Sequence, residues 1–124
     1  MSAANLTVLV VDDDALICMS TADMLASFGH TAIEAYSGRQ ALEILGQRQV
    51  DVLITDHSMP GMTGLELVRA ARADRPALPV LLASGYGEDD IGGLGGDVVL
   101  LGKPFDERAL AEGLEQVLSE RPVA

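Results

Sequence analysis

The chain has 124 residues, with 8 Lys and Arg against 19 Asp and Glu, which gives a formal net charge of −11. Such an acidic surface argues against direct binding of nucleic acid, because that binding depends on basic side chains that neutralise phosphates. No apolar run has the length of a membrane span, and the N-terminus lacks the pattern of a secretory signal. We therefore expect a cytoplasmic protein without membrane insertion, folded as a single domain over 1–124 with its core over about 5–119.

Short apolar runs alternate with helical patterns along the chain. In chain order we expect a strand at 6–11, a helix at 15–28, a strand at 31–35, a helix after Ser37, a strand at 50–55, a helix across 65–71, a strand at 79–84, a short helix within 85–96, a strand at 98–101 and a last helix between Asp106 and Ser119. Strands that read as continuous apolar runs and alternate with helices predict an α/β fold, a parallel sheet covered by helices on both faces.

Two helix starts and one weak helix can be identified from local sequence. The S-x-x-Q pattern from Ser37 to Gln40 predicts a capping box, and Asp106 is placed to cap the last helix. The segment 85–96 contains six glycines, and each glycine inside a helix costs about 0.8–1.0 kcal/mol relative to alanine. We therefore expect this fourth helix to be short, distorted or mobile.

Polar residues follow four of the five predicted strands. Ligands bind beyond the carboxyl ends of the strands in parallel α/β sheets, so these residues are expected to meet at one edge. They are Asp12, Asp13 and Asp14 after the first strand, Asp56 after the third, Ser84 after the fourth and Lys103 after the fifth. Each alone has an ordinary explanation, and Asp14 is well placed simply to cap a helix. Their convergence favours a functional site.

The chemistry of this set favours a divalent cation and a phosphoryl group. Three carboxylates, from Asp12, Asp13 and Asp56, cannot all stay ionised at close range unless a cation neutralises them. Oxygen ligands without His or Cys select a hard ion, Mg²⁺ or Mn²⁺. A carboxylate beside such an ion can accept a phosphoryl group, which Lys103 and Ser84 would stabilise.

The same residues carry a resemblance to a known family over nearly the whole chain. The matching pieces are the run 8–14 ending in Asp12-Asp13-Asp14, the stretch 53–64 with the pattern D-x-x-M-P-x-x-x-G from Asp56, the run 81–85 around Ser84, and Lys103-Pro104-Phe105. In this order they resemble the receiver domain of response regulators, the CheY-like domain of two-component signalling. The resemblance implies a flavodoxin-like, doubly wound five-stranded parallel sheet in the order 2-1-3-4-5, with five helices.

The resemblance also implies roles for individual residues. Asp56 would be the phosphoacceptor, phosphorylated by a histidine kinase or a histidine phosphotransfer protein in an Mg²⁺-dependent reaction. Asp13 and Asp56 would ligate the metal, with Asp12 acting through a metal-bound water and Ser58 through its backbone carbonyl. Ser84 would be the hydroxyl of the switch, Gly85 would admit the phosphoryl group, and Lys103 would balance its charge. A cis bond before Pro104 is expected as well.

Two positions, Leu100 and Tyr86, depart from the family or modify its behaviour, and the two histidines carry separate expectations. Leu100 stands where receivers commonly have an aromatic residue, so we predict that Ser84 and the segment 85–96 carry the response through an order–disorder change. Tyr86 is bulky enough to shield the phosphoryl group, which predicts slow self-dephosphorylation, although it could instead pack on a neighbouring helix. His57 follows Asp56 along a strand and is expected to point away from it, in a structural or exposed position. His30 is expected at the surface of a turn.

Two other functions are compatible with the sequence, and the sequence does not identify the protein that receives the signal. A phosphatase of the haloacid dehalogenase type would use the D-x-D of the first strand, with Asp12 as nucleophile and Asp14 as acid, but would leave the residues after Asp56 without a role. A binding module with a vestigial pocket is the third hypothesis. Receivers are not enzymes beyond their own phosphoryl transfer. The signal would therefore pass to an unknown protein target or act through a phosphorylation-dependent dimer. The expected contact surfaces are the first helix and the face around the fifth strand. Met1 and the short tail favour a stand-alone receiver slightly over the receiver piece of a hybrid kinase.

Overall fold

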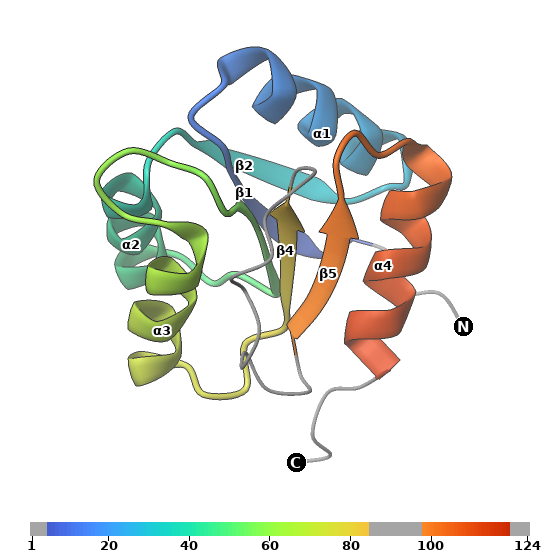
Figure 1. Ribbon diagram of the computed structural model, residues 1–124. Coiled ribbons are helices and arrows are strands. Elements are labelled where there is room, and N and C mark those ends of the chain that lie inside the picture. Colours follow the sequence, from blue (N-terminus) through green and yellow to red (C-terminus); the bar gives the residue numbers. More distant parts are fainter. Residues whose placement is uncertain (1–4, 85–97, 120–124) are drawn as a thin grey trace.

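The computed structural model describes residues 5–84 and 98–119, and its strands form one parallel sheet (Figure 1). The five strands are β1 Thr7–Val11, β2 Thr31–Ala35, β3 Val52–Asp56, β4 Val80–Ser84 and β5 Val98–Gly102. They are arranged in the order β2-β1-β3-β4-β5, and every neighbouring pair is parallel. The α/β class predicted from the sequence and the strand order implied by the resemblance are both confirmed.

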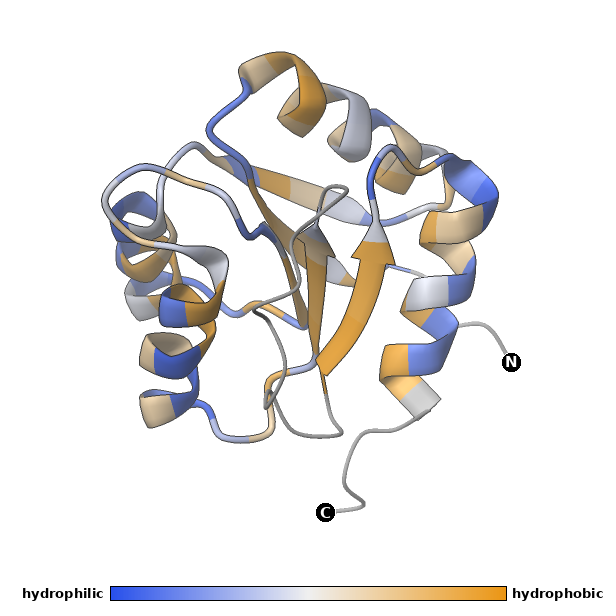
Figure 2. Cartoon of the chain, in the orientation of Figure 1, coloured by the Kyte–Doolittle hydropathy of each residue, from blue (hydrophilic) through white to orange (hydrophobic). Residues whose placement is uncertain are grey.

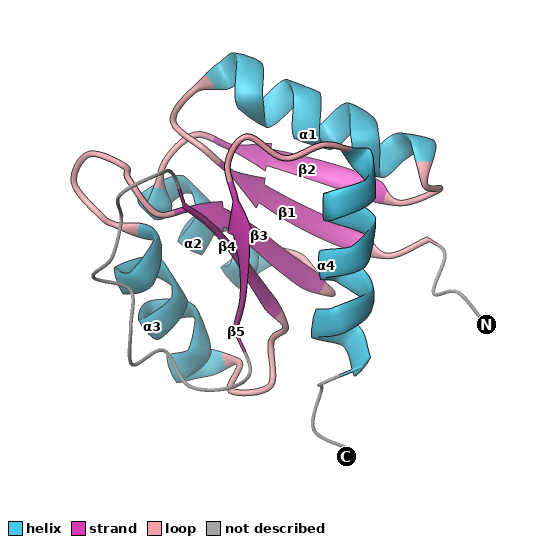
Figure 3. Cartoon of the chain, turned by 45° about the vertical axis from the view of Figure 1, so that its right-hand side comes forward, coloured by secondary structure: helices cyan, strands magenta, loops and turns pink. Residues whose placement is uncertain are grey.

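Helices lie on both faces of the sheet (Figures 1 and 3). The described residues contain four of them, α1 Ala15–Ser27, α2 Gly38–Gln47, α3 Gly64–Asp74 and α4 Glu107–Ser119. α2 and α3 cover one face, and α1 and α4 cover the other. The helix expected within 85–96 lies outside the described residues, as do Gly85 and Tyr86.

Each strand contributes side chains to two separate cores, because successive residues of a strand point to opposite faces. The core beneath α2 and α3 contains Leu9, Leu53 and Leu67, all fully buried. The core beneath α1 and α4 is built from the alternate positions and contains Val8, Val52, Leu81 and Leu110 among others. The strands are accordingly apolar along most of their length, as Figure 2 shows.

Three of the four helices start at side-chain caps that the sequence predicted in full or in part. Asp14 accepts hydrogen bonds from the backbone N–H groups of Leu16 and Ile17, and Asp106 accepts one from Ala109 at 2.9 Å. Ser37 accepts from the N–H of Gln40 at 3.1 Å as expected. The reciprocal half of that box differs, because the Gln40 side chain accepts from the N–H of Tyr36 and not of Ser37.

Two further departures concern the capping of α3 and the start of β1. A complete capping box joins Thr63 and Glu66 at the start of α3, and it was missed from sequence. The expectation that His30 is a surface residue is wrong, since it is half-buried and its Nδ1 accepts a hydrogen bond from the N–H of Leu6. This bond lies at the entry to β1, which starts one residue later than expected, at Thr7.

No helix among residues 5–84 and 98–119 combines the length and the apolar character that crossing a membrane requires.

Candidate functional site

The register of the sheet brings the ends of β1 and β3 side by side. Val11 pairs with Thr55, so Asp12 follows β1 at the level of Asp56, the last residue of β3. Asp12 is also held to the neighbouring strand, because its N–H donates to the carbonyl of Ala35 at 3.1 Å. The backbone thus fixes both carboxylates at the same edge, as the strand-end argument predicted.

β4 and β5 bring a hydroxyl and an amine to the same edge. Asp56 pairs with Ala83, and Ser84 pairs with Gly102, so Lys103 leaves the sheet beside Ser84. The N–H of Lys103 donates to the carbonyl of Ser84 at 2.9 Å. Ser84 is half-buried at the end of its strand.

Strand alternation directs the acidic and basic side chains to one face. Residues two positions earlier, Val10, Ile54 and Leu101, all belong to the core beneath α1 and α4. Asp12, Asp56 and Lys103 therefore point toward that face as well. The site accordingly lies at the edge of the sheet on the side of α1 and α4.

Lys103 joins the two buried carboxylates. Its Nζ lies 2.9 Å from Oδ1 of Asp56 and 3.3 Å from Oδ2 of Asp12. The two aspartates are 6% and 5% exposed, so neither charge is well solvated and both depend on partners within the protein. Partial burial opposes the charge on Lys103, but the hydrogen bond and charge of Asp56, and then those of Asp12, outweigh it and raise the pKa of Lys103. The ammonium therefore stays protonated at neutral pH.

Three carboxylates form a cluster that fits a hard divalent cation. One oxygen each from Asp12, Asp13 and Asp56 lies within 4.8 Å of the others, and Asp13 is the exposed member. The cluster contains oxygen donors only, which suits Mg²⁺ or Mn²⁺ better than zinc or copper. An exposed carboxylate beside two buried ones also leaves room for the waters that Mg²⁺ retains.

Asp14 is used for another purpose. Its carboxylate caps α1 through the N–H groups of Leu16 and Ile17, while its own N–H donates to Oδ1 of Asp12 at 2.9 Å. It does not belong to the carboxylate cluster. A mechanism with Asp14 as the acid partner of Asp12 is disfavoured by this geometry.

The other candidate residues are placed as follows. Ser58 is exposed in the loop between β3 and α3, and Leu100 lies on β5 with 54% of its surface exposed. The peptide bond between Lys103 and Pro104 is cis, as expected. Gly85 and Tyr86 are outside the described residues, so their predicted roles stay predictions.

Strand alternation predicts that His57 points away from the carboxylates. It is half-buried, and its Nδ1 is enclosed without a hydrogen-bond partner within the described residues. Its backbone carbonyl accepts from the N–H of Gly64 at 2.9 Å, which closes the loop between β3 and α3.

Gly64 is a residue whose role the sequence did not assign. A Cβ there would overlap the carbonyl oxygen of Asp56 and lie 2.8 Å from the Cα of His57. Only glycine lets the start of α3 pack directly on the backbone of Asp56. The glycine of the D-x-x-M-P-x-x-x-G pattern was visible in the sequence, but this backbone contact requires the folded loop.

A groove borders the site between α1 and the segment after β5. It is lined mainly by apolar side chains, including Leu16 and Met24 from α1 and Phe105, and Lys103 reaches it from the site. Leu16 is 75% exposed and Met19, also on α1, is 49% exposed. An apolar surface therefore lies directly beside the carboxylate cluster.

Comparisons with known proteins agree with this geometry. Residues 8–115 match the family model described as the response regulator receiver domain. The chain is similar to the chemotaxis protein CheY of Pseudomonas aeruginosa, with 37% identity over 119 residues that cover 89% of this chain and 94% of that protein. It is 35% identical to the sensor kinase CckA of Brucella abortus, covering 96% of this chain and 13% of the kinase.

A solved structure supports the fold. The crystal structure of a response regulator receiver protein from Sinorhizobium medicae has a TM-score of 0.86 and 27% identity to this chain, and the match covers 98% of this chain and 100% of that chain.

Proposed function

Because the chain belongs to the family of response regulator receiver domains, we propose that Asp56 is its phosphoacceptor. The donor is a phosphohistidine on a histidine kinase or a histidine phosphotransfer protein in the cytoplasm, and phosphorylation changes the binding of a downstream protein. The chain is thus a signalling protein, and its chemistry is limited to its own phosphoryl transfer and its slow reversal.

One observation carries this proposal, which is the convergence of three carboxylates and one ammonium at a single edge of the sheet. A carboxylate of Asp56 forms a P–O bond while the P–N bond to the donor imidazole breaks, and the imidazole leaves. Lys103, already 2.9 Å from Asp56, can stay paired with the added phosphoryl oxygens. Ser84 supplies a hydroxyl from the neighbouring strand.

Asp12, Asp13 and Asp56, together with the backbone carbonyl of Ser58, would hold Mg²⁺ or Mn²⁺. A bound cation neutralises the excess negative charge that the incoming phosphoryl group adds. Without it, three carboxylates and a phosphoryl group would share one ammonium, a strongly unfavourable charge balance.

The apolar groove beside α1 is the docking surface for the phosphohistidine donor. It opens next to Lys103, so a helix seated on Leu16 and Met24 would bring its histidine to the edge of the sheet. Exposed apolar side chains on α1, next to the carboxylate cluster, suit a helical partner with an apolar stripe. The sequence had favoured the first helix for this contact.

Labelling with a small phosphoryl donor tests the proposal. Wild-type protein incubated with acetyl phosphate and Mg²⁺ is expected to gain one acyl-phosphate, located at Asp56 by mass spectrometry. Asp56→Asn removes the nucleophilic carboxylate while keeping its size, and it should abolish the label. Full labelling of that variant would refute the proposal.

Asp14→Asn is the matched control in the same acidic segment. Asparagine caps a helix as well as aspartate does, so α1 should be unaffected and labelling should remain. If the wild type is instead labelled at Asp12, and Asp14→Asn loses that label, the result would support the haloacid dehalogenase type of phosphatase.

A further inference from the structure

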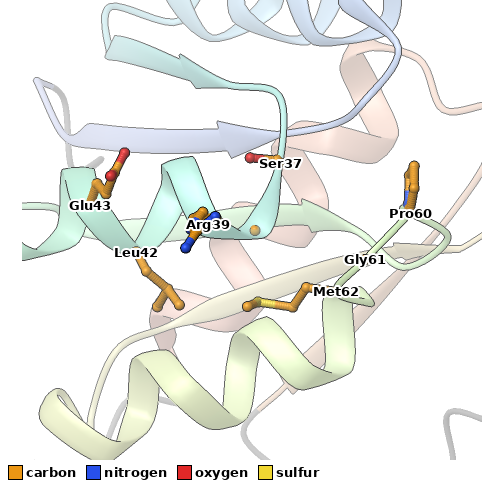
Figure 4. Close-up of a pocket in the computed structure, with 8 residues that line it drawn as sticks. Ser37, Arg39, Leu42, Glu43, Pro60, Gly61 and Met62 are labelled. Atoms are coloured by element: carbon orange, nitrogen blue, oxygen red, sulfur yellow. The ribbon is translucent and has the colours of Figure 1, made fainter.

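α2 begins in direct contact with the loop that joins β3 to α3. Its first residue, Gly38, is buried, and a Cβ there would lie 2.6 Å from Sδ of Met62 and 3.0 and 3.1 Å from its Cγ and Cβ. Figure 4 shows the Met62 side chain reaching from the loop into the space beneath α2, near Leu42. The other glycine of α2, Gly46, has no atom within 4 Å of the corresponding position.

This loop carries half of the proposed metal site. It starts at Asp56 and includes Ser58. On the side of α3 it is held by the hydrogen bond from the N–H of Gly64 to the carbonyl of His57 and by the buried side chain of Met59. On the side of α2, Met62 packs against the bare backbone of the first helical turn.

The start of α2 is connected in turn to the other half of the site. Ala35, the last residue of β2, accepts the N–H of Asp12 at 3.1 Å. Ser37 then caps α2, and Gly38 follows as the first helical residue. A short path of backbone therefore runs from the acidic pair after β1, through the start of α2, to the loop after β3.

We propose that Gly38 is a positioning residue for the metal site, because the lack of a side chain there sets how closely the loop of Asp56 and Ser58 approaches Asp12 and Asp13. The inference rests on the proposed function only in taking these residues as the metal ligands. Mg²⁺ requires near-ideal octahedral geometry at short distances, so its affinity is sensitive to small shifts of one group of ligands. A methyl group at position 38 would displace Sδ and Cγ of Met62, which can rotate away, and would also lie 3.1 Å from Cβ, which moves only with the backbone of the loop. We therefore expect the loop to shift by a few tenths of an ångström.

Calorimetric titration with Mg²⁺ tests this inference without any phosphoryl transfer. Gly38→Ala is expected to raise the dissociation constant of Mg²⁺ about tenfold, the lower end of the loss seen when groups that orient metal ligands are changed. Gly46→Ala, in the same helix but in open space, should leave it unchanged. Thermal unfolding in EDTA provides a separate readout, since a purely structural role would lower the melting temperature and leave the dissociation constant as it was.

A second variant keeps the test decisive if Gly38→Ala folds poorly. Met62→Ala removes the contact from the side of the loop and should weaken Mg²⁺ binding several-fold but less than Gly38→Ala, since nothing is pushed apart. In the double variant the new methyl group no longer meets Sδ or Cγ and meets only the Cβ that alanine retains, so its dissociation constant should lie closer to that of Met62→Ala than to that of Gly38→Ala. Values for Gly38→Ala and Met62→Ala that both lie within about twofold of wild type would overturn the inference.

Failure of this inference is distinguishable from failure of the proposed function. At saturating Mg²⁺, Gly38→Ala should still be labelled at Asp56 by acetyl phosphate. Normal labelling with unchanged Mg²⁺ affinity in the variants refutes the role of Gly38 alone. Mg²⁺ binding that responds to Gly38 in a protein that is never labelled at Asp56 refutes the proposed function alone.

Discussion

α1 and α3 lie on opposite faces of the sheet, and they differ in what they present to solvent. α3 has four charged residues, and Figure 2 shows it alternating between hydrophilic and hydrophobic colours. α1 has one charged residue, Asp23, and the first half of the helix is mostly hydrophobic in the same view. A helix that only covers a core normally keeps its outer side polar. The outward Leu16 and Met19 are consistent with the proposal that α1 also serves as a contact surface.

The side of α3 is built as a scaffold. Its start is fixed by the capping box of Thr63 and Glu66, and its end is tied to α2 because the guanidinium of Arg75 donates to the carbonyls of Leu45 and Arg48. Hydrogen bonds of this kind hold two helices in one relative position. The loop with Asp56 is thus anchored on the side of α3, whereas the proposed phosphoryl donor would approach from the side of α1.

The largest effect should come from opening the core beneath α3. Leu67 is fully buried, and Leu67→Ala is expected to lower the free energy of unfolding by about 2–5 kcal/mol through lost burial and the cavity that remains. Urea unfolding followed by circular dichroism measures this. Leu16→Ala, the same substitution on the outer side of α1, should change stability by less than about 0.5 kcal/mol. Similar losses in the two variants would contradict the distinction between scaffold and contact surface.

Much of the fold and site could be predicted because they depend on local sequence. Apolar runs are short and bounded by polar residues, so all five strands could be identified, with ends accurate to one or two residues. Parallel strands that end together predicted that Asp12, Asp56 and Lys103 would meet. These inferences need only the periodicity of a strand and the direction of a sheet.

The features that were missed depend on contacts between distant segments. Gly38 and Met62 are far apart in sequence, and no local pattern shows that one must lack a side chain to admit the other. The hydrogen bond from the N–H of Leu6 to Nδ1 of His30 likewise joins the residues that precede two strands. The capping box at Thr63 is a different case, because its T-x-x-E pattern is local and readable, and the loop signals of Pro60, Gly61 and Gly64 around it masked it.

A second prediction tests whether the inner side of α1 is as closed as that of α3. Cys18 is fully buried, and burial, together with the nearby charge of Glu34, raises its pKa from 9.0 to about 11. At pH 8 this shift lowers the thiolate fraction about 100-fold relative to the unfolded chain, so a disulfide reagent should react correspondingly slowly with the folded protein. Fast labelling of folded protein would show that α1 opens readily.

The raised pKa of Cys18 also determines whether the free energy of unfolding rises or falls with pH. Above pH 9.0 the thiol of the unfolded chain loses its proton, while the folded chain retains it until about pH 11. The unfolded state therefore binds fewer protons in this window, and the free energy of unfolding should fall as pH rises through it. Cys18→Ala should show a smaller fall over the same window, measured by urea unfolding at several pH values.

A third prediction separates contact from catalysis on the outer side of α1. The donor is chosen from a panel of phosphorylated histidine kinases as the one that labels the wild type fastest. With this kinase, Leu16→Ala should slow phosphoryl transfer about tenfold, because an anchoring side chain is lost from the interface. Labelling by acetyl phosphate, which needs no docking surface, should be unchanged. Ala70→Ser on the exposed side of α3 is the control and should affect neither rate. Equal slowing with both donors would place the effect in the site and not at the interface.

The smallest effect should come from the start of α3. Thr63→Ala removes the hydroxyl that accepts from the N–H of Glu66 and is expected to lower the free energy of unfolding by about 1 kcal/mol, whereas Thr63→Ser should retain most of the stability. Transfer from the histidine kinase should stay at the wild-type rate, since α3 lies on the face opposite the docking groove. A slower transfer in Thr63→Ala with full stability would instead mean that the donor also contacts the loop before α3.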